Sequence, residues 1–228
     1  AKRLLADKPV ITLIACRDMW MTAHEKVKAR LSALGARLID NVVLTDEAGS
    51  YKSFLSTPLW VLSGNKGPFA FGIPRAGVKP DEIAAADRFG FALSEAFAQG
   101  NTFEGPIFEG LGAVESRHRL IASEKVGQRS FKAWGALLRL LGKRGSIARR
   151  GVIVLYIVFL LCLIVTVIPI TTVIKRLLEP LLLKRIERQR AYYSAPSGEA
   201  RDRIPALRKR MAAENILEKN SGLEAETP

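Results

Sequence analysis

The segment Cys16–Trp20 carries the side chains best suited to hold a ligand. It follows an apolar run, Val10–Ala15, and ligands of open α/β sheets bind beyond the carboxyl ends of such strands. A planar ring such as a flavin would stack on the indole of Trp20. The alternative is that Trp20 packs the following helix onto the sheet. The predicted ligand-binding residues are Cys16, Arg17, Asp18, Met19 and Trp20.

Cys16 and His24 are the candidates for catalysis. A cysteine with a histidine partner can act as the nucleophile in carbon–carbon condensation, and the first helical turns after the loop would bring His24 near Cys16. The other histidine, His118, falls in a glycine-rich stretch. The alternative role of Cys16 is that of a small buried residue at the end of a strand.

Several other kinds of site are not expected. The two cysteines, Cys16 and Cys162, form no Cys-x-x-Cys pair, and no His, Asp or Glu cluster has the spacing of metal ligands. Glu115 stands where a dinucleotide fingerprint beginning at Gly110 would need its third glycine. The default setting for the first half of the chain is reducing and cytosolic.

The first half of the chain reads as an α/β unit. Val10–Ala15 predicts a fully buried strand, and Ala36–Leu44 predicts a second one. Between them, Thr22 and Glu25 predict a capping box for a helix that ends at Gly35. A right-handed βαβ crossover is the expected geometry.

The expected α/β domain covers residues 1–99. Residues 45–80 are rich in Gly and Pro and predict an irregular covering segment. Pro80–Ala98 predicts a helix with Pro and acidic residues in its first turn. The glycine-rich residues 100–128 predict a linker.

The most apolar part of the chain is Gly151–Ile174, which contains no charged residue. As a helix it would be about 36 Å long, enough to cross a hydrocarbon core of roughly 30 Å. The alternative, a buried core helix, fits less well because core helices are shorter and usually keep a polar stripe. We therefore predict a transmembrane helix that Pro169 kinks.

The regions around this segment are basic. Residues 129–150 predict an amphipathic helix lying in the membrane surface, with packing on the α/β domain as the alternative. Residues 175–194 predict an interfacial basic helix that Tyr192 and Tyr193 anchor at the headgroups. Residues 195–228 predict an exposed, partly disordered polar tail.

The net charge of +13 is concentrated in the second half of the chain. Because its cations crowd both ends of an apolar segment, we expect membrane lipids, and not nucleic acid, as the partner. Six Lys and Arg residues lie in the 20 residues on either side of the segment, so flanking charge gives no orientation. A single crossing would put Lys175 onward outside the cytosol, whereas a sharp turn at Pro169 would keep it inside.

Several runs of residues resemble one family. They are KPVITLIACRDMW, EKVKARLSALGA, STPLWVLSGNK, RLIASEKVGQRSFKAW, and the apolar segment with VIPIT and a trailing YYSAPSG. Together they are similar to the flavodoxin-like proteins known as dialkylresorcinol condensing enzymes, over nearly all of residues 8–198.

The resemblance implies a flavodoxin-like doubly wound parallel sheet, tethered to the bacterial inner membrane with its N-terminal domain in the cytoplasm. It implies FMN as cofactor and Cys16–Trp20 as the loop beside the flavin ring. No Ser-x-Thr-Gly phosphate loop precedes Val10, so we expect the C-terminal part of that fold, in a piece of a longer protein.

The implied function is a step in the synthesis of dialkylresorcinol lipids. It would be a flavin-dependent aromatisation or the condensing step on acyl-derived chains, with a ketosynthase and an acyl carrier protein as partners. The competing interpretation is a non-catalytic membrane scaffold, whose degenerate flavodoxin-like domain holds a partner enzyme at the bilayer.

Overall fold

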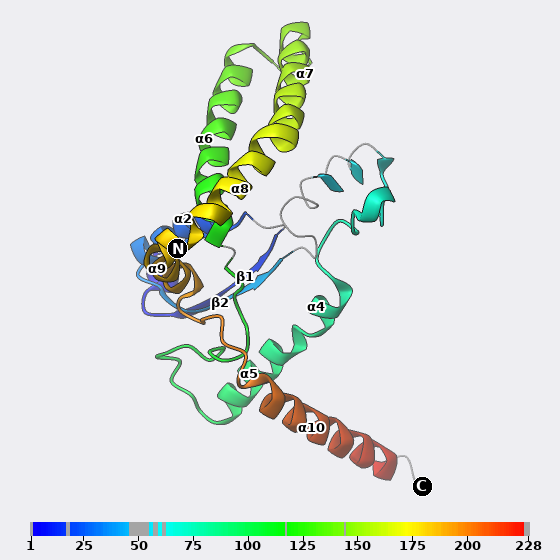
Figure 1. Cartoon of the computed structure of the whole chain (residues 1–228). Helices are drawn as coiled ribbons and strands as arrows, with labels where there is room; N and C mark the ends of the chain where they lie inside the picture. Colours follow the sequence, from blue (N-terminus) through cyan, green and yellow to red (C-terminus); the bar gives the residue numbers. More distant parts are fainter. Residues whose placement is uncertain are drawn as a thin grey trace.

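A two-stranded parallel sheet lies at the centre of the α/β unit (Figure 1). The computed structural model describes residues 2–16, 19–45, 55–56, 59–60, 63–116, 118–143 and 145–225. After a short helix α1 (Lys2–Leu5), the strands β1 (Pro9–Ala15) and β2 (Arg37–Leu44) are joined by α2 (Met21–Ala33). The predicted strand–helix–strand unit and the mixed α/β class are therefore confirmed, while the flavodoxin-like fold stays a prediction.

The two strands differ in burial. They pair from Pro9 opposite Arg37 to Ala15 opposite Leu44, with a shift in register after Val10. β2 has five consecutive buried residues. The prediction that Val10–Ala15 is fully buried is wrong, because Leu13 is 70% exposed. In the described part of the chain β1 pairs only with β2, so its second edge and part of one face stay open.

The predicted helix over residues 80–98 is divided in two. α4 (Pro80–Ala84) ends in a turn, and α5 (Asp87–Ala98) begins after it. The buried guanidinium of Arg88 donates hydrogen bonds to the carbonyl of Ala85 in this turn and to Leu111 O at 3.0 Å. The break between the helices thus frees a carbonyl that Arg88 binds. Through its second hydrogen bond, Arg88 joins α5 to the segment after residue 100.

The prediction of a linker is wrong for residues 100–116, because this segment packs on the α/β unit. Ile107, Phe108, Leu111, Ala113 and Val114 are all buried in the main hydrophobic core. Their segment covers the outer edge of β2, where Val43 N donates to Ala113 O at 2.8 Å. The glycines allow this close packing: a Cβ on Gly110 or Gly112, both at positive φ, would lie 2.8 Å from a neighbouring arginine side chain.

The start of the polar tail is also packed against this unit, contrary to the prediction for residues 195–228. Ser197 and Leu207 are fully buried. Gly112 N donates to Ala200 O at 2.6 Å, and Arg203 N donates to Gly110 O at 3.0 Å. Helix α10 (Ile204–Ala225) follows and projects away from the sheet (Figure 1). The composition of the tail hid these contacts because its polar side chains, such as Ser197 and Arg203, bind groups of the α/β unit that lie far away in the sequence.

A long helical hairpin rises from the other side of the unit (Figure 1). Its first leg is α6 (His118–Leu140), and its second leg begins with α7 (Ile147–Cys162). The helical run then continues through a π-helical turn (Leu163–Val167), α8 (Ile168–Leu178), a 3₁₀ turn (Glu179–Leu182) and α9 (Leu183–Ser194). In the described residues, Ile147–Ser194 is the one helix long and apolar enough to cross a membrane.

The hairpin changes three predictions for the flanking regions. The amphipathic helix predicted at 129–150 starts earlier, and its aromatic residues pack on α7: the Trp134 ring lies 5.1 Å from that of Tyr156 and 5.4 Å from that of Phe159. Tyr192 does not stand free as a headgroup anchor, because its hydroxyl donates to Glu25 at 2.6 Å. Tyr193 is buried.

The irregularity predicted at Pro169 lies one turn earlier. The π-helical turn at Leu163–Val167 precedes the proline, whose ring and missing N–H disturb the preceding turn. Thr166 Oγ1 donates to Cys162 O at 2.6 Å within this region. The axis changes direction between α7 and α8, which leads the chain back toward the α/β unit (Figure 1).

Candidate functional site

The predicted ligand-binding loop lies at the carboxyl end of β1, as expected. Cys16 is half-buried, and its backbone N–H donates to Leu44 O at 3.0 Å, which extends the β1–β2 ladder by one bond. Met19 is partly buried. Arg17 and Asp18 lie outside the described residues, so their predicted role stays a prediction.

Trp20 is part of the hydrophobic core. Its side chain is 3% exposed, and it packs in one cluster with Met21 and the β2 residues Ile39 and Val43. The Trp20 ring centroid lies 5.7 Å from that of His24. This burial favours the alternative in which Trp20 packs α2 onto the sheet. A flavin ring stacked on Trp20 does not fit this arrangement of the described residues.

The N-terminus of α2 is occupied by a carboxylate from a distant segment. Glu124 on α6 accepts hydrogen bonds from Met21 N at 3.2 Å, from Thr22 N at 2.6 Å and from Thr22 Oγ1 at 2.5 Å. The predicted capping box is wrong, because the helix begins at Met21 and Trp20 is its N-cap without a side-chain bond. Glu124 supplies the negative charge that a helix N-terminus favours.

His24 is buried and neutral at pH 7. Its Nε2 lies 3.1 Å from Thr12 Oγ1, and its Nδ1 has no hydrogen-bond partner. The pKa of His24 is lowered from 6.5 to about 4, mainly by burial and also by the charge of Lys28, while Glu25 acts in the opposite direction. The pairing of His24 with Cys16 as catalytic residues stays a prediction. The side chain of His118 lies outside the described part.

A buried polar cluster that sequence reasoning missed lies in the middle of β2. The carboxylate of Asp40, which is fully buried, accepts hydrogen bonds from Ile107 N at 2.6 Å, from Phe108 N at 3.3 Å and from Ser197 Oγ at 2.6 Å. Burial raises the pKa of Asp40, while these three hydrogen bonds oppose the rise. The same Ser197 Oγ accepts from Asn41 N at 2.7 Å.

The sequence contains a signal for this cluster. Asp40 and Asn41 interrupt an apolar strand, and polar groups buried in a strand need hydrogen-bond partners. The partners come from residues far along the chain, and their identity is not readable from the strand. The cluster is structural, because its hydrogen bonds hold segments of this chain together.

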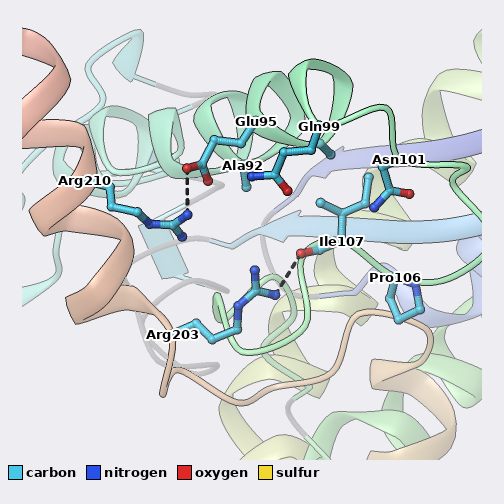
Figure 2. A pocket seen from close by; sticks show the side chains of 9 residues that line it. Ala92, Glu95, Gln99, Asn101, Pro106, Ile107, Arg203 and Arg210 are labelled. Carbon is cyan, nitrogen blue, oxygen red and sulfur yellow. Dashed lines mark hydrogen bonds and ion pairs between the residues drawn. The ribbon is translucent and has the colours of Figure 1, made fainter.

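A small cavity of about 190 Å³ lies between α5, the segment at residues 101–107 and α10 (Figure 2). It is smaller than the roughly 300 Å³ at which ligand pockets begin. Its two arginines are bound internally: Arg203 Nη1 donates to Ile107 O at 3.1 Å, and Arg210 Nη1 donates to Glu95 Oε1 at 2.6 Å. Figure 2 shows both guanidinium groups turned toward these partners.

Comparisons of the chain with protein-family models, curated proteins and solved structures gave no match. Within the described ranges, no group of three or more His, Cys, Asp or Glu side chains is arranged to hold a metal ion. The feature of the molecule best suited to an external partner is therefore the exposed apolar surface of α7 and α8.

The buried His24 predicts a specific loss of stability in acid. Its pKa is about 4 in the folded chain and 6.5 in the unfolded one. The contribution of the neutral His24 to the free energy of unfolding is therefore fully present above pH 6.5 and is lost as the pH falls toward 4. We expect the free energy of unfolding to fall by roughly 3 kcal/mol more in the wild type than in His24→Gln over this range. Urea unfolding of the full chain in detergent measures this, and equal pH slopes would contradict it.

Proposed function

We propose that this protein is attached to the bacterial inner membrane, with its α/β unit in the cytoplasm, and that it serves the synthesis of dialkylresorcinol-type lipids. The observation that carries the attachment is the helical run Ile147–Ser194. Its most apolar 18-residue window has a mean hydropathy of 3.2, and none of that window is buried inside the molecule. Exposed apolar side chains of this extent require a partner other than water.

The role in lipid synthesis is supported by the sequence resemblance. The similar runs begin at the residues of β1 and its following loop, and they continue through α6 and the apolar helices. An enzyme system that builds long-chain lipids has its products in the bilayer, and a protein held there has access to them. We propose a ketosynthase and an acyl carrier protein as its partners in this system.

Within this system the geometry favours the scaffold role over catalysis. A flavin ring stacked on Trp20 would need an exposed indole face, but Trp20 is 3% exposed. A bound phosphate at the α2 N-terminus would meet the carboxylate of Glu124, which takes the hydrogen bonds available there. The α/β unit would then hold a partner enzyme at the bilayer.

The second candidate function is the flavin-dependent aromatisation, or the condensing step, that the resemblance implies. The observation in its favour is the position of the loop Cys16–Trp20, which follows the carboxyl end of the parallel strand β1. Under this function the residues of the loop would hold FMN.

Membrane attachment through α7 predicts that charges in this helix release the protein. Val154 and Val158 are 61% and 50% exposed, so lysines there disturb little of the internal packing. Each lysine costs about 3 kcal/mol in hydrocarbon. We expect the wild type to stay with the membrane pellet after an alkaline wash and Val154→Lys/Val158→Lys to appear in the supernatant.

The matched control for this test is Phe71→Lys, because Phe71 is 98% exposed outside the hairpin. This variant should stay in the pellet. A double variant that remains as firmly bound as the control would contradict attachment through α7.

Binding of FMN separates the two roles. The scaffold role predicts that the full chain, purified in detergent, shows no yellow flavin absorbance and no saturable quenching of FMN fluorescence. The catalytic role predicts both, with weaker binding in Trp20→Phe and unchanged binding in Trp134→Phe, whose ring packs on α7. A yellow protein would overturn the scaffold role.

A further inference from the structure

Both legs of the hairpin are fixed to the same helix, α2. On the first leg, Glu124 of α6 binds the backbone of Met21 and Thr22 at the start of α2. On the second leg, Tyr192 of α9 donates to Glu25 at 2.6 Å. Just beyond α9, Lys28 Nζ donates to Ala195 O at 3.5 Å. The chain therefore leaves α2 along α6 and returns to it along α9.

The residues that follow the second leg are built into the core of the α/β unit. Ser197 lies between Asp40 and Asn41 of β2, and it is fully buried. Leu207 is fully buried as well. A unit packed from residues on both sides of an apolar segment lies on one side of the membrane. The segment between them must therefore cross an even number of times or not at all.

Two crossings would require α6 to be the second membrane helix, and its composition opposes this. Four exposed cations lie along it: Lys125, Arg129, Lys132 and Arg139. Each charge at the centre of a bilayer lowers the equilibrium constant for insertion of the helix by about a hundredfold. Among the described helices, only the run Ile147–Ser194 meets the length and hydropathy of a crossing helix, although α6 has 23 residues.

The same four cations gather on one face of α6. With 3.6 residues per turn they fall within an arc of about 80°. The apolar side chains Phe131 and Trp134 lie on the other side, where their rings pack on Tyr156 of α7 at centroid distances of 6.0 and 5.1 Å. The hairpin thus has a basic ridge on α6 and an apolar body on α7 and α8.

We propose that the α6–α7 hairpin (residues 118–178) lies in one leaflet of the membrane and does not cross it. The apolar helices α7 and α8 are embedded among the acyl chains of that leaflet, because their exposed apolar side chains have to leave water. The basic ridge of α6 contacts the headgroups of anionic phospholipids in the same leaflet. The proposal rests on the membrane attachment proposed above and adds its topology and its lipid partner.

This topology accounts for the equal charge on the two flanks of the apolar segment. Arg149 and Arg150 precede the uncharged segment on α7, Arg176 follows it on α8, and the 20 residues on either side hold six Lys and Arg residues each. In a single crossing the cations would be expected to favour the cytoplasmic end. In a one-sided anchor both ends lie at the same headgroup layer, so both ends are basic.

Labelling of single cysteines tests the topology. In a background with Cys16 and Cys162 replaced, three exposed positions carry the reporters. Gln99→Cys marks the end of α5, Lys143→Cys the hairpin turn and Glu214→Cys helix α10. The probe is a membrane-impermeant maleimide added to sealed, inverted inner-membrane vesicles that contain the full chain. We expect all three reporters to react equally with and without detergent.

Two results would overturn the proposal. If Glu214→Cys is protected until detergent is added while Gln99→Cys reacts, the segment crosses once. If only Lys143→Cys is protected, the hairpin crosses and returns. If the chain is absent from washed membranes altogether, the attachment itself fails, which is a different and separately visible outcome.

Vesicle flotation tests the lipid partner. We expect the full chain to bind vesicles containing phosphatidylglycerol more tightly than vesicles of phosphatidylcholine alone. Arg129→Gln/Lys132→Gln should weaken binding to the anionic vesicles about 25-fold, at about fivefold for each cation. The control Lys209→Gln changes an exposed cation on α10 and should have no effect. Equal losses in the two variants, or no preference for anionic vesicles, would contradict the role of the basic ridge.

Discussion

The arrangement of this molecule depends on the buried carboxylate of Asp40. It binds two backbone N–H groups at residues 107 and 108 and the hydroxyl of Ser197, and it thereby joins β2 to segments about 67 and 157 residues away along the chain. A buried carboxylate is costly unless such partners are present. The three segments therefore have to come together if β2 is to be buried.

This constraint determines where the apolar helices can be. Because Ser197 belongs to the same unit as β2, the hairpin begins and ends beside α2. In the proposed topology, the bilayer therefore meets the protein from one side. The exposed apolar surface of α7 and the basic ridge of α6 then have a common explanation in one leaflet. Glu124 joins the α/β unit to the hairpin, since this residue of α6 caps the N-terminus of α2 and thereby fixes the base of α6.

The parts of the fold that depend on local pattern were predictable. β1, α2 and β2 follow from apolar runs and a glycine at the end of the helix, and the apolar helix follows from its length. The segment at 100–116 and the tail were mispredicted because glycine and polar residues indicate loops. Here the segment binds β2 through the carbonyl of Ala113, and the tail binds it through the hydroxyl of Ser197. The cap of α2 was beyond prediction, since Glu124 lies about 100 residues from Thr22. At the loop Cys16–Trp20, the sequence showed an aromatic residue but not its burial.

The most direct test of this account is the proximity of α2 and α9 in the native membrane. In a background without native cysteines, the pair Glu25→Cys/Tyr192→Cys should form an intramolecular cross-link with a short bis-maleimide, because the two wild-type side chains are hydrogen-bonded at 2.6 Å. The control pair Glu25→Cys/Glu214→Cys should not, since α10 projects away from the sheet (Figure 1). Cross-linking of the first pair in membranes would support a single packed unit on one side of the bilayer, and cross-linking no greater than that of the control would contradict it.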